Sequence, residues 1–296
     1  MQVEKKFLDS DRSRPILSNI FDAAVLRARE KLEQKNIPEP VNPHGRRIVV
    51  ATNRIASLAT TLATWLAQSN EIDNHTYDLS AVNSDQLDWF CANVAGIGVE
   101  EVRAYRQELE SMSELSRHFQ TVRESAPQRA RYPASIKWGR RIGWYVLVRH
   151  FKPKFVVETG VHFGLGAMAI CAALRKNSNG GRYLGLDIAP KMGDLVRSFT
   201  DVAELRYGPS VETLKTVDGH IDMFIHDSFH GADYESQEYT LAEKLLSDKA
   251  LVLSDNAHVC SKLANFAEAT GRRFHFFKET PKNHFYEGAG IGVAVP

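Results

Sequence analysis

The chain has 296 residues, of which 43% are hydrophobic and 25% are charged, as in a globular protein of one or two domains. Its 37 Lys and Arg against 36 Asp and Glu give a net charge of +1, so no overall field attracts nucleic acid or an anionic membrane. The longest apolar runs fall far short of the roughly 20 residues of a membrane helix, and the start (MQVEKKFLDSDRSR) has no apolar signal core; we expect a cytoplasmic protein.

Residues 1–132 carry mainly helical patterns, because apolar residues recur at the spacing of one helix face. A short strand is considered only around residues 47–51, and a polar linker at 125–132 marks the expected domain boundary. We therefore expect two parts, a helical region over 1–132 and a second domain over 133–296. The three helical stripes are Ile20, Phe21, Ala24, Val25, Ala28 and Leu32; Ile55, Leu58, Leu62, Trp65 and Leu66; and Val102, Tyr105, Leu109 and Met112.

After residue 133, short apolar strands alternate with helices. Helices of this length between strands form βαβ units, so we predict an α/β fold with a doubly wound, Rossmann-like and mostly parallel sheet. Two final strands without a helix between them predict an antiparallel pair at the end of the sheet. The expected strands are 154–158, 182–187, 203–207, 221–226, 250–254, 273–278 and 290–295, and the helices are 137–149, with arginines at the rim of its packed face, 165–174, 211–217, 233–246 and 261–270.

The first strand ends in ETGVHFGLG, residues 158–166. Ligands of doubly wound sheets bind beyond the carboxyl ends of the strands. The glycine spacing of a dinucleotide fingerprint is absent here, which argues against a nicotinamide-dependent oxidoreductase. The Glu158 carboxylate repels a pyrophosphate but can hold an ammonium group such as that of S-adenosylmethionine, and Asp187 at the next strand end can accept hydrogen bonds from a ribose. A glycine turn that serves only close packing is the alternative.

The segments VVETGVHFGLGA, YLGLD and IDMFIHD resemble a class I S-adenosylmethionine-dependent methyltransferase, over about residues 136–296. The more usual motif has a glycine where His162 stands; the present spacing of glutamate and two glycines is the version seen in catechol O-methyltransferase-like enzymes. For His226, at the end of the fourth strand, a structural role is the alternative. The cofactor contacts expected from this resemblance are Glu158, Gly160, Gly164 and Asp187, with Ser210 in the adenine region and His226 as a further candidate.

Two further strand ends carry acids, Asp227 after the fourth strand and Asp255-Asn256 after the fifth. If the two strands are neighbours, these side chains open onto one crevice and form an oxygen-rich set suited to Mg²⁺ or another divalent ion. Catechol O-methyltransferase-like enzymes carry an Asp and then an Asp-Asn pair at these places. Macrolide-sugar O-methyltransferases have a related Asp-x-x-His at the first place, which Asp227 and His230 fit, although their second acidic pair differs. A turn or helix cap at residues 255–256 and a metal-free enzyme stay open.

Methyl transfer from a sulfonium to oxygen is an in-line displacement, and a hydroxyl is a poor nucleophile until its proton leaves. A cation on the hydroxyl lowers its pKa, and a base within about 3 Å removes the proton. His230 lies where the catechol-type enzymes carry a lysine base, so we predict His230 as the general base, with Asp227 beside it. A histidine that only bonds a backbone carbonyl near Gly231 is the alternative.

These motifs predict an S-adenosylmethionine-dependent O-methyltransferase that acts on a hydroxyl of a small molecule, assisted by a divalent cation. The resemblance implies a sugar or phenolic acceptor from secondary metabolism. In such enzymes an added helical region covers the acceptor site or builds an interface in a homodimer or higher homo-oligomer. An N-methyltransferase on the same scaffold and a non-catalytic S-adenosylmethionine-binding module are the alternatives.

Overall fold

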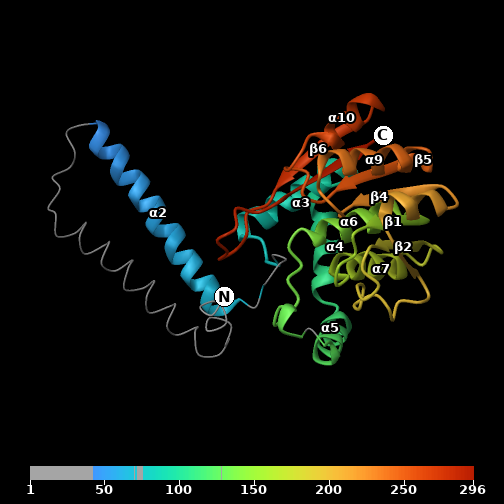
Figure 1. Ribbon diagram of the computed structural model, residues 1–296, viewed down its shortest axis with the longest axis horizontal. Coiled ribbons are helices and arrows are strands. Elements are labelled where there is room, and N and C mark those ends of the chain that lie inside the picture. The colour runs from blue at the N-terminus through green and yellow to red at the C-terminus, as the bar shows by residue number, and fades with distance from the viewer. Residues whose placement is uncertain (1–42, 70, 72–75, 128) are drawn as a thin grey trace, which may run out of the picture. The chain divides into compact units, whose positions relative to one another are not determined.

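The computed structural model describes residues 43–69, 71, 76–127 and 129–296 (Figure 1). The chain forms two compact units, one of residues 1–75 with 281–287 and the other of residues 76–280 with 288–296. The predicted stripe from Ile20 to Leu32 lies outside the described residues.

The described part of the first unit contains the long helix α2 (Pro43–Gln68). The stripe from Ile55 to Leu66 lies on this helix, as predicted. The strand considered around residues 47–51 is wrong, because the β-branched run Ile48-Val49-Val50 is part of α2; β-branched residues lower helix propensity only slightly, and a longer helical pattern overrides them. No described helix is both long and apolar enough to cross a bilayer.

The second unit starts with helices that precede the sheet in the chain. They are α3 (Ala81–Ala95), α4 (Val99–Glu110), α5 (Ser113–Ser125), the 3-10 turn η2 (Arg129–Arg131) and α6 (Arg141–Phe151). Because α3 and α4 pack on each other and on α6, they belong to the same compact unit as the sheet. The domain boundary expected near residue 132 stays a prediction.

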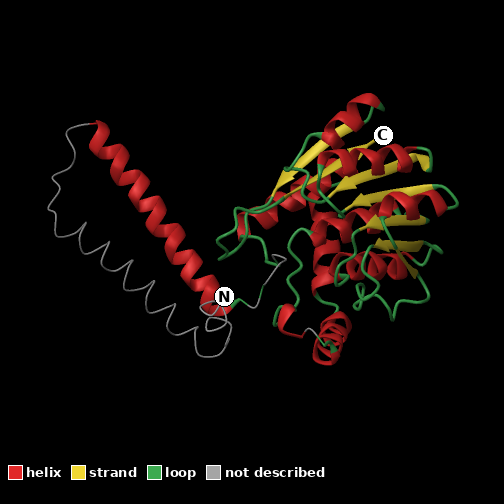
Figure 2. Ribbon diagram, viewed as in Figure 1, coloured by secondary structure: helices red, strands yellow, loops and turns green. Residues whose placement is uncertain are grey.

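A seven-stranded sheet in the order β3-β2-β1-β4-β5-β7-β6 forms the centre of this unit (Figures 1 and 2). Strands β1 to β5 run parallel, while β7 is antiparallel to both β5 and β6. The predicted doubly wound sheet with an antiparallel C-terminal pair is thus confirmed. The strands are β1 (Phe155–Thr159), β2 (Arg182–Asp187), β3 (Ala203–Tyr207), β4 (Ile221–His226), β5 (Leu246–Ser254), β6 (Arg273–Lys278) and β7 (Gly290–Val295).

Helices lie on both faces of the sheet. The chain runs outward from β1 to β3 in one direction and from β4 to β5 in the other, so right-handed crossovers place their helices on opposite faces. Accordingly α7 packs on α6, whereas α9 contacts α8 and α10. The connecting elements are α7 (Leu165–Asn177), α8 (Ser210–Thr213), the 3-10 turn η3 (Leu214–Thr216), α9 (Ala232–Glu243) and α10 (Lys262–Ala269).

The reversal of strand order between β1 and β4 fixes where a ligand can bind. In doubly wound sheets the crevice lies at such a switch point, beyond the carboxyl ends of the strands. The register aligns Thr159 of β1 with His226 of β4, and His226 with Ser254 of β5. The residues that follow, Gly160, Asp227 and Asp255, therefore leave the sheet side by side.

Candidate active site

The loop after β1 requires glycine at two of its positions. Gly160 has φ of 82° and Gly164 has φ of 89°, in the region that favours glycine. A Cβ at Gly160 would overlap the carbonyl oxygen of Asp227 and lie 2.7 Å from the Cα of Ser228. His162, at the position where the more usual motif has glycine, also has a left-handed φ, of 50°. The glycine loop thus lies backbone to backbone against the loop after β4.

Glu158 is a buried carboxylate at the end of β1, and one of its oxygens accepts a hydrogen bond from the Tyr183 hydroxyl. Its other oxygen faces Gly166 of α7, where an added Cβ would approach it to 3.4 Å. Burial raises the pKa of Glu158 to about 7, although Tyr183 and the Arg141 charge oppose the rise. A cationic ligand group would strongly stabilise the ionised form of a buried acid in this position.

Asp187, at the end of β2, holds the glycine loop in shape. Its Oδ2 accepts the backbone N–H groups of Val161 and His162, each at 2.9 Å. Its Oδ1 accepts the N–H of Ala189 at 2.8 Å. Because a carboxylate offers about four acceptor sites, one site of Oδ1 stays available for a ribose hydroxyl. The structural contacts of Asp187 were not foreseen from the sequence.

The two predicted acids Asp227 and Asp255 meet at the ends of β4 and β5. Burial and the neighbouring Asp255 charge raise the pKa of Asp227. For Asp255, burial also favours a higher pKa, but the Arg140 guanidinium and a hydrogen bond with Asp227 outweigh it and lower the pKa. These opposite shifts favour the neutral form of Asp227 and the ionised form of Asp255.

Arg140 is a buried cation of this site, which sequence reasoning placed only among the arginines at the rim of a predicted helix. Its guanidinium pairs with both oxygens of Asp255. It also reaches Glu279, at 3.4 Å from Nη1 to Oε2. Since Arg140 lies far from both partners in the chain, only the fold brings the three groups together.

His230 lies between the two acidic strand ends. Its Nε2 is 2.8 Å from the side-chain nitrogen of Asn256 and 3.8 Å from Oδ1 of Asp227. Burial lowers the pKa of His230, so the neutral imidazole is favoured. Ligand atoms of Asp227, His230 and Asp255 all lie within 4.8 Å of one another, which makes them a potential metal-binding group. The predicted ligand Asn256 contacts His230 in this arrangement.

Two predicted cofactor residues, Ser210 and His226, both bond to Glu238 of α9. Ser210 donates to Oε1 of Glu238, and Nδ1 of the fully buried His226 lies 2.6 Å from Oε2. A direct cofactor contact from either residue stays a prediction. Glu238 itself was missed, although a signal existed: Glu235 and Glu238 fall on the same stripe of α9 as the apolar Tyr239 and Ala242, the stripe that faces the core.

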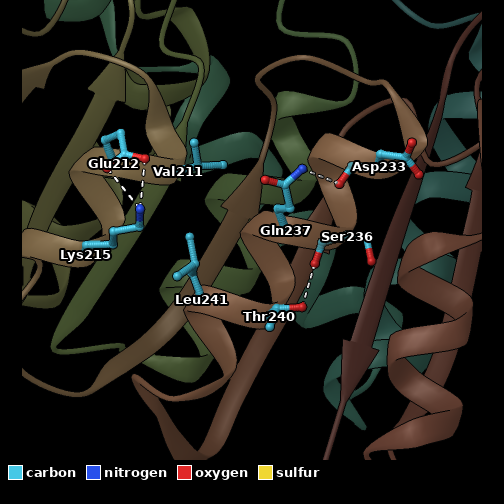
Figure 3. A pocket seen from close by; sticks show the side chains of 8 residues that line it. All are labelled: Val211, Glu212, Lys215, Asp233, Ser236, Gln237, Thr240 and Leu241. Atoms are coloured by element: carbon cyan, nitrogen blue, oxygen red, sulfur yellow. Dashed lines mark hydrogen bonds and ion pairs between the residues drawn. The ribbon is translucent and has the colours of Figure 1, made fainter.

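A separate hollow of about 490 Å³ lies between α8, η3 and α9 (Figure 3). Its polar side chains bond to one another or to their own helix: Lys215 with Glu212 at 2.8 Å, and Gln237 with the carbonyl of Asp233 at 3.2 Å. None of the predicted site residues lines it, so we assign no function to it. The lining residues are Val211, Glu212, Lys215, Asp233, Ser236, Gln237, Thr240 and Leu241.

The fold and the switch-point loops are those of a Rossmann-like domain with a ligand crevice beyond the ends of β1 and β4. Residues 157–257 match the family model described as a methyltransferase domain. This segment contains every site residue predicted from the sequence, from Glu158 to Asn256. The expected class, an S-adenosylmethionine-dependent methyltransferase, is thereby confirmed. A search among curated proteins found none that matches.

Several solved structures are similar to this chain. A cofactor-bound protein from MTB, Rv0187, is 16% identical with a TM-score of 0.48, over 60% of this chain and 87% of that chain. The O-methyltransferase TomG from Streptomyces achromogenes, solved with S-adenosylmethionine, is 18% identical with a TM-score of 0.44, over 62% and 87%. An O-methyltransferase from Bacillus cereus, solved with S-adenosylhomocysteine, is 15% identical with a TM-score of 0.44, over 71% and 97%.

Proposed function

We propose that the protein transfers the methyl group of S-adenosylmethionine to a hydroxyl of a small molecule, with His230 as general base. The observation that carries this proposal is the backbone contact between Gly160 and Asp227. It brings the loop suited to the cofactor directly against the loop that carries His230. A methyl donor beside Glu158 and a base at His230 then share one crevice, as an in-line transfer requires.

The role of each residue follows from its chemistry. Glu158 binds the ammonium group of the cofactor, and the remaining acceptor site of Asp187 binds a ribose hydroxyl. His230 takes the proton of the acceptor hydroxyl through Nε2. In the structure this nitrogen accepts a hydrogen bond from the Asn256 side-chain amide at 2.8 Å, which the acceptor hydroxyl would displace. The neutral imidazole favoured by burial can accept this proton.

The acceptor is proposed to be a sugar or phenolic group, because apolar side chains stand beside the base. Phe229 directly precedes His230 and is 69% exposed, and Val259, on the neighbouring loop, is 55% exposed. Exposed apolar groups next to a polar site suit a ring that packs an apolar face on them, such as a phenol or the C–H face of a sugar, and turns one hydroxyl toward the base.

A divalent cation is proposed to assist the reaction. Asp227 and Asp255 offer two carboxylate oxygens close enough for a single ion, with the amide oxygen of Asn256 as the third expected ligand and His230 kept free as the base. Bound there, the ion would lower the pKa of the acceptor hydroxyl. Asp255 would then be shared between the ion and Arg140.

Calorimetry with S-adenosylhomocysteine, NAD and Mg²⁺, followed by labelled methyl transfer to catechol, simple sugars and amines, tests this function. We expect binding of S-adenosylhomocysteine but not NAD, and label on a hydroxyl. Label only on amines would support the N-methyltransferase instead, and cofactor binding without any transfer would support a non-catalytic module. Full activity in excess EDTA would exclude the metal.

The variant His230→Ala tests the base. We expect turnover to fall by roughly 10²- to 10⁴-fold, while the affinity for S-adenosylhomocysteine is retained. The control is His220→Ala, which removes an exposed histidine at the opposite end of β4. Equal turnover of the wild type and His230→Ala would remove His230 from the mechanism.

A further inference from the structure

Glu238 lies at the centre of a buried polar network that no step of the proposed reaction uses. Its side chain is fully buried on the sheet-facing side of α9. Its Oε2 bonds to Thr159 at 2.7 Å and to His226 at 2.6 Å, and its Oε1 to Ser228 at 2.6 Å and to Ser210.

These four bonds fill the capacity of the group. An ionised carboxylate accepts about four hydrogen bonds and donates none. Bonds from His226, Ser210 and Ser228 lower the pKa of Glu238 despite the opposing effect of burial. The carboxylate is therefore ionised, and Nδ1 of His226 carries the donated proton.

The four donors come from three separate strand ends, those of β1, β3 and β4. Thr159 is the last residue of β1 and directly precedes Gly160 of the glycine loop. Ser228 directly follows Asp227, and His226 directly precedes it. Ser210 starts the helix after β3. One carboxylate thus bonds to the segments that carry both halves of the crevice.

We infer that Glu238 is a positioning residue that fixes the cofactor loop and the base-carrying loop relative to each other. It touches neither cofactor nor acceptor, and acts through Thr159 on one side and Ser228 on the other. The inference rests on the proposed function for the identity of the two loops. The ring of His226 also lies edge to face against that of His230, with 5.3 Å between the ring centres, so one member of the network packs on the proposed base.

The first variant is Glu238→Gln, which keeps the size of the side chain. Its amide has a single oxygen and cannot accept four bonds, so at least two donors lose their acceptor. We expect the Kd for S-adenosylhomocysteine to rise roughly 5- to 30-fold. Amide hydrogen exchange should become faster in residues 158–164 and 226–231, and stay unchanged in β7 at 290–295. The matched control is Glu243→Gln, an exposed carboxyl on the same helix.

Two single-contact variants separate the arms of the network. Thr159→Val should speed exchange in 158–164 and raise the Kd, whereas Ser228→Ala should speed exchange only in 226–231. When either variant is combined with Glu238→Gln, the exchange rate in its own segment should rise little further, because the shared hydrogen bond is already lost. If Glu238→Gln does not fold, these two milder variants decide the question.

The inference is overturned if Glu238→Gln exchanges like the wild type in both loops, or if exchange accelerates equally in β7, which would signal general destabilisation. It is also overturned if both single-contact variants affect the two loops alike. The exchange measurements need neither acceptor nor turnover. A wild type that fails to bind S-adenosylhomocysteine would refute the proposed function and leave the exchange test of Glu238 intact.

Discussion

At the scale of single residues, the cofactor side of the site depends on the titration of Glu158. Its pKa of about 7 means that the carboxyl is largely neutral at pH 6 and ionised at pH 8. An ammonium group binds the ionised form, so the Kd for S-adenosylhomocysteine should rise roughly tenfold from pH 8 to pH 6. Calorimetry across this range measures it, and Glu158→Gln should give weaker binding without this dependence. A wild-type Kd that does not change between pH 8 and pH 6 would contradict the role of Glu158 in binding the ammonium group.

The same shift has a consequence for the protein without ligand. A carboxyl whose folded pKa exceeds its unfolded value stabilises the fold below the unfolded pKa, and this stability is lost as the pH rises toward 7. Glu158→Gln should therefore gain stability relative to the wild type at pH 8 and lose that advantage near pH 5. Urea unfolding at the two pH values compares the free energies of unfolding.

Loss of Arg140 should destabilise the second unit strongly. Arg140→Met leaves the buried carboxylates of Asp255 and Glu279 without the guanidinium that pairs with both, at a cost of about 3–5 kcal/mol in the free energy of unfolding. Arg175→Met is the control, because its pair with Asp201 is exposed and is worth about 0–1 kcal/mol. Urea unfolding measures the free energy of unfolding of both variants. Equal small losses would show that the two buried carboxylates do not need the charge of Arg140.

At the scale of elements, the contact between the loops after β1 and β4 makes a glycine essential. Gly160→Ala adds a Cβ that overlaps the Asp227 backbone, whereas Gly180→Ala has a similar φ, of 73°, and open space around it. We expect Gly180→Ala to lower the free energy of unfolding by about 1–2 kcal/mol, from its backbone conformation alone. Gly160→Ala should lower it by more. Unfolding and cofactor affinity measure the difference; equal effects would mean that the loops do not need their close contact.

The start of α6 illustrates how an element boundary shapes the site. The apolar spacing predicts a helix from residue 137, but α6 starts at Arg141. Gly139 has φ of 50°, and a Cβ there would lie 2.6 Å from the carbonyl oxygen of Tyr77. This turn delays the start of the helix by four residues relative to the prediction. Arg140, at the helix start, pairs with Asp255.

At the scale of the whole molecule, the second unit has a core of its own. One cluster joins Val157, Leu186 and Phe224 of the sheet to Tyr239 of α9 and Leu263 of α10. All of these residues belong to the second unit.

A chain that starts at Thr76 should therefore fold and bind S-adenosylhomocysteine like the full chain. Circular dichroism, thermal unfolding and calorimetry test this, and a truncated chain without a cooperative transition would contradict it. Sedimentation of both chains tests the predicted homo-oligomer: a smaller assembly after truncation would assign its interface to the first 75 residues.

Features that depend on near neighbours in the chain could be predicted from the residues alone. The alternation of strands and helices follows from hydrophobic periodicity, and Glu158, Asp187, Asp227 and Asp255 follow from reading the strand ends. The sheet, the glycine positions and the class of protein could all be predicted on that basis.

Which of these groups meet, and which partner neutralises each charge, became known from the folded chain. The pairing of Arg140 with Asp255, the contact of Asn256 with His230 and the four bonds to Glu238 join residues from different elements. Such contacts depend on strand order and register, because a buried charge takes whichever partner the fold brings within hydrogen-bonding distance. No local pattern encodes that choice, so the chemical balance of the site exists only in the folded chain.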